Sequence, residues 1–269
     1  MSSRLERWSV SLVAVFVYLF LYLPLLLIVL YAFNKTTINA WPFPGFSTRW
    51  FNTLAHDPEP RQAAWLSVKI AVAATAMALL LGTSMAFAFA RFKFKGGQAI
   101  NFGVTLPIIL PGVITGVALA SFFIFLGEEL SVWTVIIGHI TFCIVIVFNN
   151  VLARLRRLSP SLEEASRDLG ASGARTFWYV TLPSIRTALV AGALLSLALS
   201  FDEIAVTFFL AGADTNTLPL WIFGKFRNSQ ALPEVNAVAA VILVVSIPMI
   251  AVASYLMREE GSARVIGEK

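Results

Sequence analysis

Six long apolar runs constrain the fold of this chain more than any other feature of its sequence. They span residues 9–33, 63–90, 103–126, 132–152, 185–211 and 235–256. An α-helix needs about 20 apolar residues to cross the hydrocarbon core of a bilayer. Hydrophobic residues make up 58% of the chain and charged residues only 13%, whereas about 25% of the residues of soluble domains are charged. The sequence therefore predicts an all-α polytopic membrane protein with six transmembrane helices.

The loops between these runs carry the positive charges unequally, and this predicts the orientation of the chain. One side holds Arg4, Arg7, Arg91, Lys93, Lys95, Arg154, Arg156, Arg157, Arg167, Arg175, Arg186, Arg258, Arg264 and Lys269. The other side holds Lys35, Arg49, Arg61, Lys225 and Arg227, with Lys69 near the start of the second run. Cytoplasmic loops are enriched in Lys and Arg. We therefore expect both termini and a loop at 156–184 to be cytoplasmic, and loops at 34–62 and 212–234 to face outwards. The net charge of +5 follows from this bias and does not indicate nucleic-acid binding.

The sequence argues against a cleaved signal peptide, a disulfide within the chain and a metal site. Arg4 and Arg7 precede the first run, but this run is longer than a secretory signal core and no small-residue cleavage pattern follows it, so it is predicted to be a retained span. Cys143 is the single cysteine, which excludes a disulfide within the chain. His139 and Cys143 are four residues apart on a predicted helix, which is too few ligands for a metal. We expect His139 to form hydrogen bonds between helices.

A polar segment at 164–183, with the sequence EASRDLGASGARTFWYVTLP, lies between the fourth and fifth runs. Ser161 is expected to cap a short helix, because its hydroxyl can accept from the first backbone amides. Glu163 and Glu164 would lie in the first turn, where the helix dipole favours acids. Gly170 is expected to end this helix, since glycine adopts the left-handed conformation at low cost.

A second short helix is predicted at 174–181, and Pro183 then stands at the beginning of the fifth run. On such a short helix three adjacent aromatic side chains cannot all face one core. They are Phe177, Trp178 and Tyr179. Taken by itself, this pattern also fits an amphipathic loop that lies on the lipid surface with its aromatic residues among the headgroups.

The same segment resembles the cytoplasmic loop of permeases of ATP-driven bacterial importers. Their pattern is Glu-Ala-Ala, three residues, Gly, nine residues, and then Ile-x-Leu-Pro. This chain has the full spacing, with Ser166 in place of the second Ala and Val180 in place of the Ile. The stretches GHITFCIVIVFNN, LSLALSFDEI, LPLWIF and LPEVNAVA further resemble the second membrane subunit of spermidine and putrescine importers.

This resemblance implies a type I ABC importer permease of the MetI-like fold, with residues 1–269 as one transmembrane domain in the bacterial inner membrane. It implies that loop 156–184, which we call the coupling loop, docks on an ATPase and transmits its movement. The residues carried over to this role are Glu164, Ala165, Gly170, Ala171, Arg175, Phe177, Trp178, Leu182 and Pro183. The implied partners are a second homologous permease, two ATP-binding subunits that hold ATP and Mg, and a periplasmic substrate-binding protein.

The sequence contains no phosphate-binding loop of the Gly-x-x-x-x-Gly-Lys-Ser/Thr type and no catalytic constellation of the common hydrolases. We therefore expect no catalytic residue, no metal and no cofactor in this chain, and a transporter subunit rather than an enzyme. An ion-coupled secondary transporter or channel is a second hypothesis, although no clear internal repeat of the kind such transporters carry is present.

The third run predicts a bend, and polar residues of the fifth run predict where the transport path lies. Pro107, Pro111, Gly112 and Gly116 predict a kink or unwound turn near the cytoplasmic end of the third span. In the fifth run, polar residues spaced four, three and four apart would form one stripe on a single helix. They are Ser196, Ser200, Glu203 and Thr207.

We expect this stripe to line the path and Glu203 to meet a cationic substrate, since an ionisable group within a span is costly and often functional. Asp202 would point about 100° away from Glu203. The alternative is that both acids lie near the outer interface and pair with Lys or Arg of a neighbouring helix. Another small solute remains an alternative to a polyamine.

Overall fold

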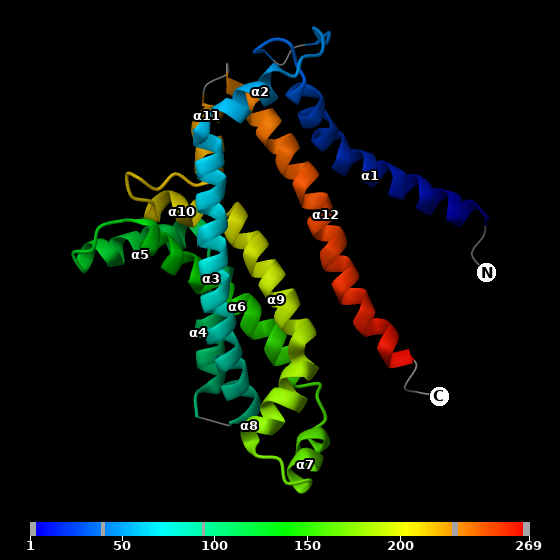
Figure 1. Cartoon of the computed structure of the whole chain (residues 1–269), viewed down its shortest axis with the longest axis vertical. Coiled ribbons are helices and arrows are strands. Elements are labelled where there is room, and N and C mark those ends of the chain that lie inside the picture. Colours follow the sequence, from blue (N-terminus) through cyan, green and yellow to red (C-terminus); the bar gives the residue numbers. More distant parts are fainter. Residues whose placement is uncertain (1–3, 39–40, 93–94, 228–230, 266–269) are drawn as a thin grey trace. The chain divides into compact units, whose positions relative to one another are not determined.

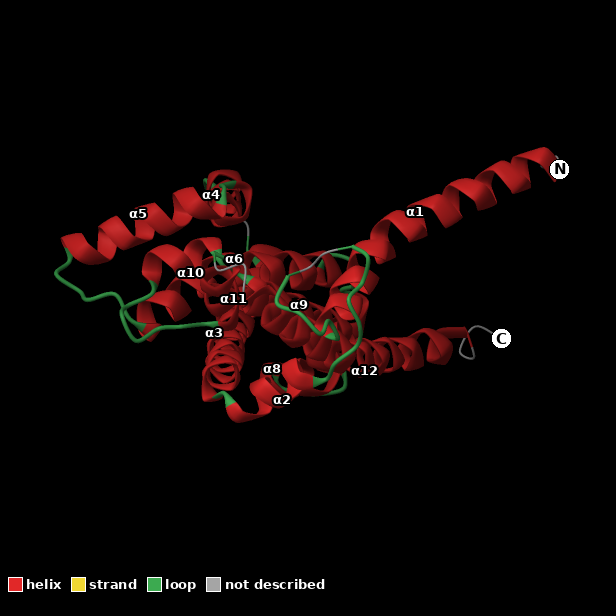
Figure 2. Cartoon of the chain, turned by 90° about the horizontal axis from the view of Figure 1, so that it is seen from above, coloured by secondary structure: helices red, strands yellow, loops and turns green. Residues whose placement is uncertain are grey.

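The computed structural model describes residues 4–38, 41–92, 95–227 and 231–265, and these residues form helices joined by loops, without a β-strand (Figures 1 and 2). The elements are α1 Arg4–Ala32, α2 Arg49–His56, α3 Pro58–Arg91, α4 Gly97–Ile109, α5 Gly112–Phe125, α6 Val132–Leu155, α7 Ser161–Asp168, α8 Gly173–Thr176, the π-helix η1 Phe177–Thr181, α9 Leu182–Asp202, α10 Ala205–Leu210, α11 Leu218–Phe226 and α12 Leu232–Val265. Lys93 and Lys269, which are counted above among the cytoplasmic charges, lie outside the described residues.

Four of the described helices are long and apolar enough to cross a membrane: Trp8–Ala32, Pro58–Arg91, Val132–Leu155 and Gly173–Asp202. The pair Gly97–Ile109 and Gly112–Phe125 passes the same test together but is bent by 106°. The apolar part of α12, Leu232–Pro248, is shorter. The prediction of a helical membrane protein is therefore confirmed, while the number of six spans stays a prediction.

The chain divides into two compact units, Met1–Gln62 with Trp221–Val252, and Ala63–Leu220 with Ala253–Lys269. The first unit has a small core of Ala32, Trp50, Ala237 and Ala240. Within it the indole Nε1 of Trp50 donates a hydrogen bond of 2.7 Å to the backbone oxygen of Asn34. The prediction of one permease domain over 1–269 stays a prediction.

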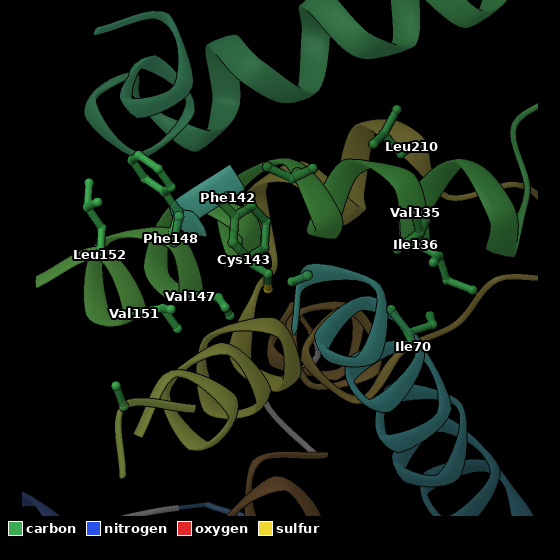
Figure 3. Close-up of a cluster of buried hydrophobic side chains, with 14 of the residues drawn as sticks. Ile70, Val135, Ile136, Phe142, Cys143, Val147, Phe148, Val151, Leu152 and Leu210 are labelled. Carbon is green, nitrogen blue, oxygen red and sulfur yellow. The ribbon is translucent and has the colours of Figure 1, made fainter. Parts of the chain in front are cut away.

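Helix α6 is the centre of the second unit, and its side chains are buried in several directions (Figure 3). A helix that is apolar on all faces has no side to turn to water and is buried by its neighbours. Three glycines, which have no side chain, allow α6 and its neighbouring helices to approach each other closely. Small residues are typical of such contacts between helices in lipid. A Cβ added at Gly82 of α3 would lie 3.0 Å from the backbone oxygen of Ile144, and one at Gly192 of α9 would lie 3.4 Å from Cα of Val147. Gly138 of α6 faces Leu210 of α10 in the same way.

Candidate functional site

The coupling loop contains the predicted turn at Gly170, with the backbone geometry that glycine permits. Gly170 has φ +81°, and its N–H donates to the oxygen of Arg167 at 2.8 Å. The N–H of Ala171 donates to the oxygen of Ser166 at 3.1 Å. These bonds satisfy the last carbonyls of α7. No atom lies within 4 Å of an added Cβ at Gly170, so the position requires glycine for its φ and not for space.

Two details of the predicted coupling loop are wrong. Ser161 is the first residue of α7 and not its cap. Pro160 holds the cap position, while the hydroxyl of Ser161 pairs with that of Ser159 at 2.6 Å.

The second predicted helix, 174–181, is also not separate from the following span. Helices α8 and α9 are joined through η1 without a break, so that Gly173–Asp202 is one continuous helix. A proline inside a helix removes one backbone bond and crowds the carbonyl four residues earlier. The wider π turn before Pro183, in which the N–H of Leu182 donates to the oxygen of Phe177, accommodates it.

The residues predicted to couple to an ATPase fall into two groups. Side chains of both α7 and η1 are exposed, and in η1 Trp178 has 62% and Tyr179 has 81% of its full accessibility. The exposed members of the predicted set are Glu164, Ala165, Gly170, Arg175, Trp178 and Pro183. Phe177 points the other way and packs on Phe87 of α3, with ring centroids 5.5 Å apart. Ala171 and Leu182 are half-buried. In Figure 1, α7 and α8 lie at the end of α9 that is away from α10.

Glu163 is a residue of this site that the sequence placed in the first turn of a helix but not among the coupling residues. It is buried, whereas the adjacent Glu164 is exposed. Its Oε1 accepts from the guanidinium of Arg91 in α3 and from the hydroxyl of Thr181 in η1, the latter at 2.8 Å. Arg167 lies 3.7 Å from its Oε2. The available sequence signal is the i, i+4 spacing of Glu163 and Arg167, which does not identify the partner on α3.

The fifth predicted span is broken, which corrects the expectation of a single helix over 185–211. Helix α9 ends at Asp202, Glu203 has an extended backbone with φ −72° and ψ 116°, and α10 begins at Ala205. Glu203 and Thr207 therefore do not continue the helical stripe of Ser196 and Ser200. The carboxylate Oε1 of Glu203 instead accepts from the N–H of Val206 at 2.9 Å, so it caps the start of α10.

The predicted bend in the third span is confirmed, but it lies between two helices of similar length and not close to one end. Helix α4 ends at Ile109 and α5 begins at Gly112. Glycines of α5 allow it to meet α10 closely at the second break. An added Cβ at Gly112 would lie 3.1 Å from Cβ of Ala205 and 3.6 Å from Oε1 of Glu203, and one at Gly116 would lie 3.2 Å from Cα of Val206. The two broken spans therefore contact each other beside the Glu203 carboxylate.

His139 of α6 connects both sides of the second break through hydrogen bonds. Its Nδ1 lies 2.7 Å from Oγ of Ser200 in α9, and its Nε2 lies 2.8 Å from Oγ1 of Thr207 in α10. The hydroxyl of Thr207 donates to the backbone oxygen of Glu203 at 2.8 Å. Thr207 therefore accepts from Nε2–H of His139, which leaves Nδ1 to accept from Ser200. The prediction of interhelical hydrogen bonding by His139 is confirmed.

The five residues of the predicted path are in different environments. Ser196, Ser200 and Thr207 are buried in helix contacts, and the hydroxyl of Ser196 donates to the backbone oxygen of Cys143 at 3.4 Å. Asp202 is exposed and Glu203 is half-buried. In this conformation the acidic pair at the break, and not the hydroxyl groups, is the accessible polar part of the set. Among the described residues no group of three or more His, Cys, Asp or Glu is placed to hold a metal ion.

Three features define the class of protein: other helices surround a central span, two spans are broken, and the coupling loop continues without a break into α9. The fold is that of a membrane subunit of an ABC transporter. It is similar to a chain in the crystal structure of a bacterial ABC transporter involved in the import of the acidic polysaccharide alginate, with a TM-score of 0.68 and 18% sequence identity, over 96% of this chain and 98% of that chain.

Sequence comparison then places the chain in a family. Residues 78–258 match the family described as binding-protein-dependent transport system inner membrane component, and the chain belongs to it. The chain is 35% identical to the putrescine transport system permease protein PotI of Escherichia coli K12 over 229 residues, which are 82% of this chain and 80% of PotI. It is 33% identical to the spermidine/putrescine transport system permease protein PotC of Haemophilus influenzae over 244 residues, which are 90% of this chain and 94% of PotC. The chain is thus a homologue of polyamine ABC importer permeases and a multi-pass membrane protein.

Proposed function

We propose that this chain is the membrane-spanning permease subunit of an ATP-driven importer of polyamines such as putrescine and spermidine. The observation that carries the proposal is the continuous helix Gly173–Asp202. Its 30 residues correspond to about 45 Å at a rise of about 1.5 Å per residue. It runs from the exposed surface of the coupling loop to the acidic break at Glu203, so a displacement at one end reaches the other.

The partners in this proposal are a second homologous permease, two ATPase subunits that bind ATP and Mg, and a periplasmic binding protein that delivers the solute. Binding of ATP closes the ATPase pair and moves the exposed surface of α7 and η1. The spans then rock so that the cavity faces outwards, and hydrolysis returns it to face inwards. The charge bias of the loops supports an orientation with both termini and the coupling loop in the cytoplasm.

The substrate class is supported by the two polyamine permeases to which the chain is homologous and by Asp202 and Glu203. A polyamine is a flexible cation with several ammonium groups, and carboxylates bind ammonium groups by charge-assisted hydrogen bonds. Because Glu203 caps α10, its carboxylate has one oxygen committed to Val206. Asp202 has no such bond within α10 and is exposed, so it is the freer of the two acids for a passing cation.

A secondary transporter is the second candidate, because broken spans that meet within the membrane are typical of such proteins. The two candidates differ in whether an ATPase is part of the complex. The experiment is to purify the reconstituted complex and measure ATP hydrolysis with binding proteins loaded with putrescine, spermidine, or uncharged and anionic solutes. Stimulation by the polyamine-loaded proteins is the expected result. Absence of any bound ATPase overturns the importer, and stimulation only by a non-cationic solute overturns the polyamine.

Three glycines supply matched variants for the coupling role. Gly170 and Gly96 both have positive φ, +81° and +84°, and neither has an atom within 4 Å of an added Cβ, but only Gly170 is in the coupling loop. Gly173 is in the loop, with equally open space but no positive φ. Gly170→Asp is expected to abolish stimulated hydrolysis. Gly96→Asp, which carries the same strain elsewhere, and Gly173→Ala are expected to retain it. Equal loss in Gly96→Asp would assign the effect to folding and contradict the coupling role.

The acidic pair is tested by Asp202→Asn and Glu203→Gln, which remove one charge each. The amide oxygen of Gln can still accept from Val206, so the cap of α10 is retained. Uptake of polyamines is expected to fall in both variants, and uptake unchanged in Glu203→Gln would show that the pathway assignment of this residue is wrong.

A further inference from the structure

The coupling loop is fixed to the structure at a second place besides its continuity with α9. This place is the buried carboxylate of Glu163, which is 8% exposed although it lies in an eight-residue helix on the surface. The neighbouring Glu164 is exposed. Two adjacent acids of the same helix therefore have opposite environments, and only one of them is available to a partner protein.

The contacts of Glu163 join α7 to η1, later in the same loop, and to α3, which is far earlier in the sequence. Arg91 is the last residue of α3 and is 72 positions away from Glu163. Thr181 is in η1, directly before α9, and donates to the same carboxylate oxygen at 2.8 Å. Arg167, one turn further along α7, lies 3.7 Å from the other oxygen. Hydrogen bonds between ionised partners are about twice as strong as neutral ones, so this carboxylate is the main polar connection between α3, α7 and η1.

A second contact lies one turn before Arg91 on the same face of α3. Phe87 packs on Phe177 of η1, with ring centroids 5.5 Å apart. Residues four apart on a helix are neighbours on its surface, so Phe87 and Arg91 form a two-point contact with the loop. Within the loop, the hydroxyl groups of Ser166 and Thr176 lie 3.1 Å apart and join α7 to α8. The loop and the end of α3 are thereby connected as one body.

We propose that Glu163 is the positioning residue that transmits movement of the coupling loop to α3. The inference rests on the proposed function, because it concerns how movement of the ATPase is transmitted to the transmembrane helices. The movement reaches α9 through the continuous backbone of Gly173–Asp202, and it reaches α3 through the carboxylate of Glu163. Because α3 packs directly on α6 at Gly82, this second route also reaches the central helix.

The test compares Glu163→Gln with Asp168→Asn in the complete reconstituted complex. Each variant removes one negative charge from α7 without changing side-chain size, and Asp168 is exposed and is not among the residues assigned to coupling. Glu163→Gln is expected to assemble with the ATPase and to hydrolyse ATP on stimulation, but to move on the order of tenfold less solute per ATP, the factor expected when a charged hydrogen bond to a partly exposed arginine becomes a neutral one. Asp168→Asn is expected to keep the wild-type ratio of solute to ATP.

A charge reversal at both partners distinguishes transmission of movement from a purely structural effect. Arg91→Glu and Glu163→Arg each place two like charges together and are expected to uncouple transport from hydrolysis. The double variant restores an opposite pair and is expected to recover the ratio of solute to ATP. A wild-type ratio in Glu163→Gln, an equal loss in Asp168→Asn, or a double variant no better than the single ones would overturn the proposal. If no ATPase binds even the wild-type chain, the proposed function itself fails, and this inference fails with it.

Discussion

Gly82→Ala tests whether direct contact between α3 and α6 holds the second unit together. A Cβ at residue 82 would lie 3.0 Å from the backbone oxygen of Ile144 and from Cβ of Val147, and 3.1 Å from the backbone nitrogen of Phe148. Normal contacts begin at 3.4 Å, so the two helices must separate by a few tenths of an ångström. Backbone atoms cannot rotate away, and overpacking of this kind costs about 1–3 kcal/mol. Alanine recovers up to about 1 kcal/mol of helix propensity, which leaves a net loss of up to about 2 kcal/mol.

Gly103→Ala is the matched control, because Gly103 lies inside α4 and has no atom within 4 Å of an added Cβ. It receives the gain in propensity without the clash. The assay is the apparent melting temperature of the purified protein in detergent, together with uptake in membrane vesicles. Gly82→Ala is expected to melt at a lower temperature than the wild type, and Gly103→Ala at the same or a higher one. If both variants melt together at or above the wild-type temperature, α3 does not contact α6 as described.

Two further predictions concern buried hydrogen bonds. His139→Phe leaves the hydroxyl of Ser200 without its partner, while Thr207 keeps its bond to Glu203. The expected loss of stability is about 1–3 kcal/mol. Adding Ser200→Ala should recover part of the lost melting temperature, and a further decrease would contradict the hydrogen bond between His139 and Ser200. Trp50→Phe removes the bond to Asn34 from a side chain that is 7% exposed, so a loss of about 1–2 kcal/mol is expected in the same assay. Trp41→Phe, at a side chain that is 82% exposed, is the control, and equal losses would refute the reasoning.

The sequence alone predicted the helical membrane class and most of the long helices. Helices α1, α3 and α6 contain the predicted runs 9–33, 63–90 and 132–152 to within a residue, because transfer of an apolar segment into lipid depends on its own composition. The turn at Gly170 was also predictable, since tolerance of a positive φ is a property of a single residue. The motif spacing likewise identified the family without any knowledge of tertiary contacts.

The break after Asp202 could not be predicted in the same way. Residues 202–204 contain neither Pro nor Gly, so nothing local ends α9 there. Helix α10 is separated from α9 where it packs against Gly112 and Gly116 of α5, and the carboxylate of Glu203 caps its first turn. The predicted stripe assumed one continuous helix, and it therefore placed Thr207 and Ser200 on a common face instead of on two sides of His139.

The different burial of Glu163 and Glu164 likewise separates what depends on neighbouring residues from what depends on distant ones. Both acids lie in the first turn of α7 and interact favourably with its dipole, so their place in this turn is predictable from neighbouring residues alone. Which of the two is buried depends on the tertiary fold, because Arg91 comes from a helix 72 positions earlier in the chain. Local preferences depend on near neighbours and can be read from the sequence, whereas burial of a charge depends on which distant partner reaches it.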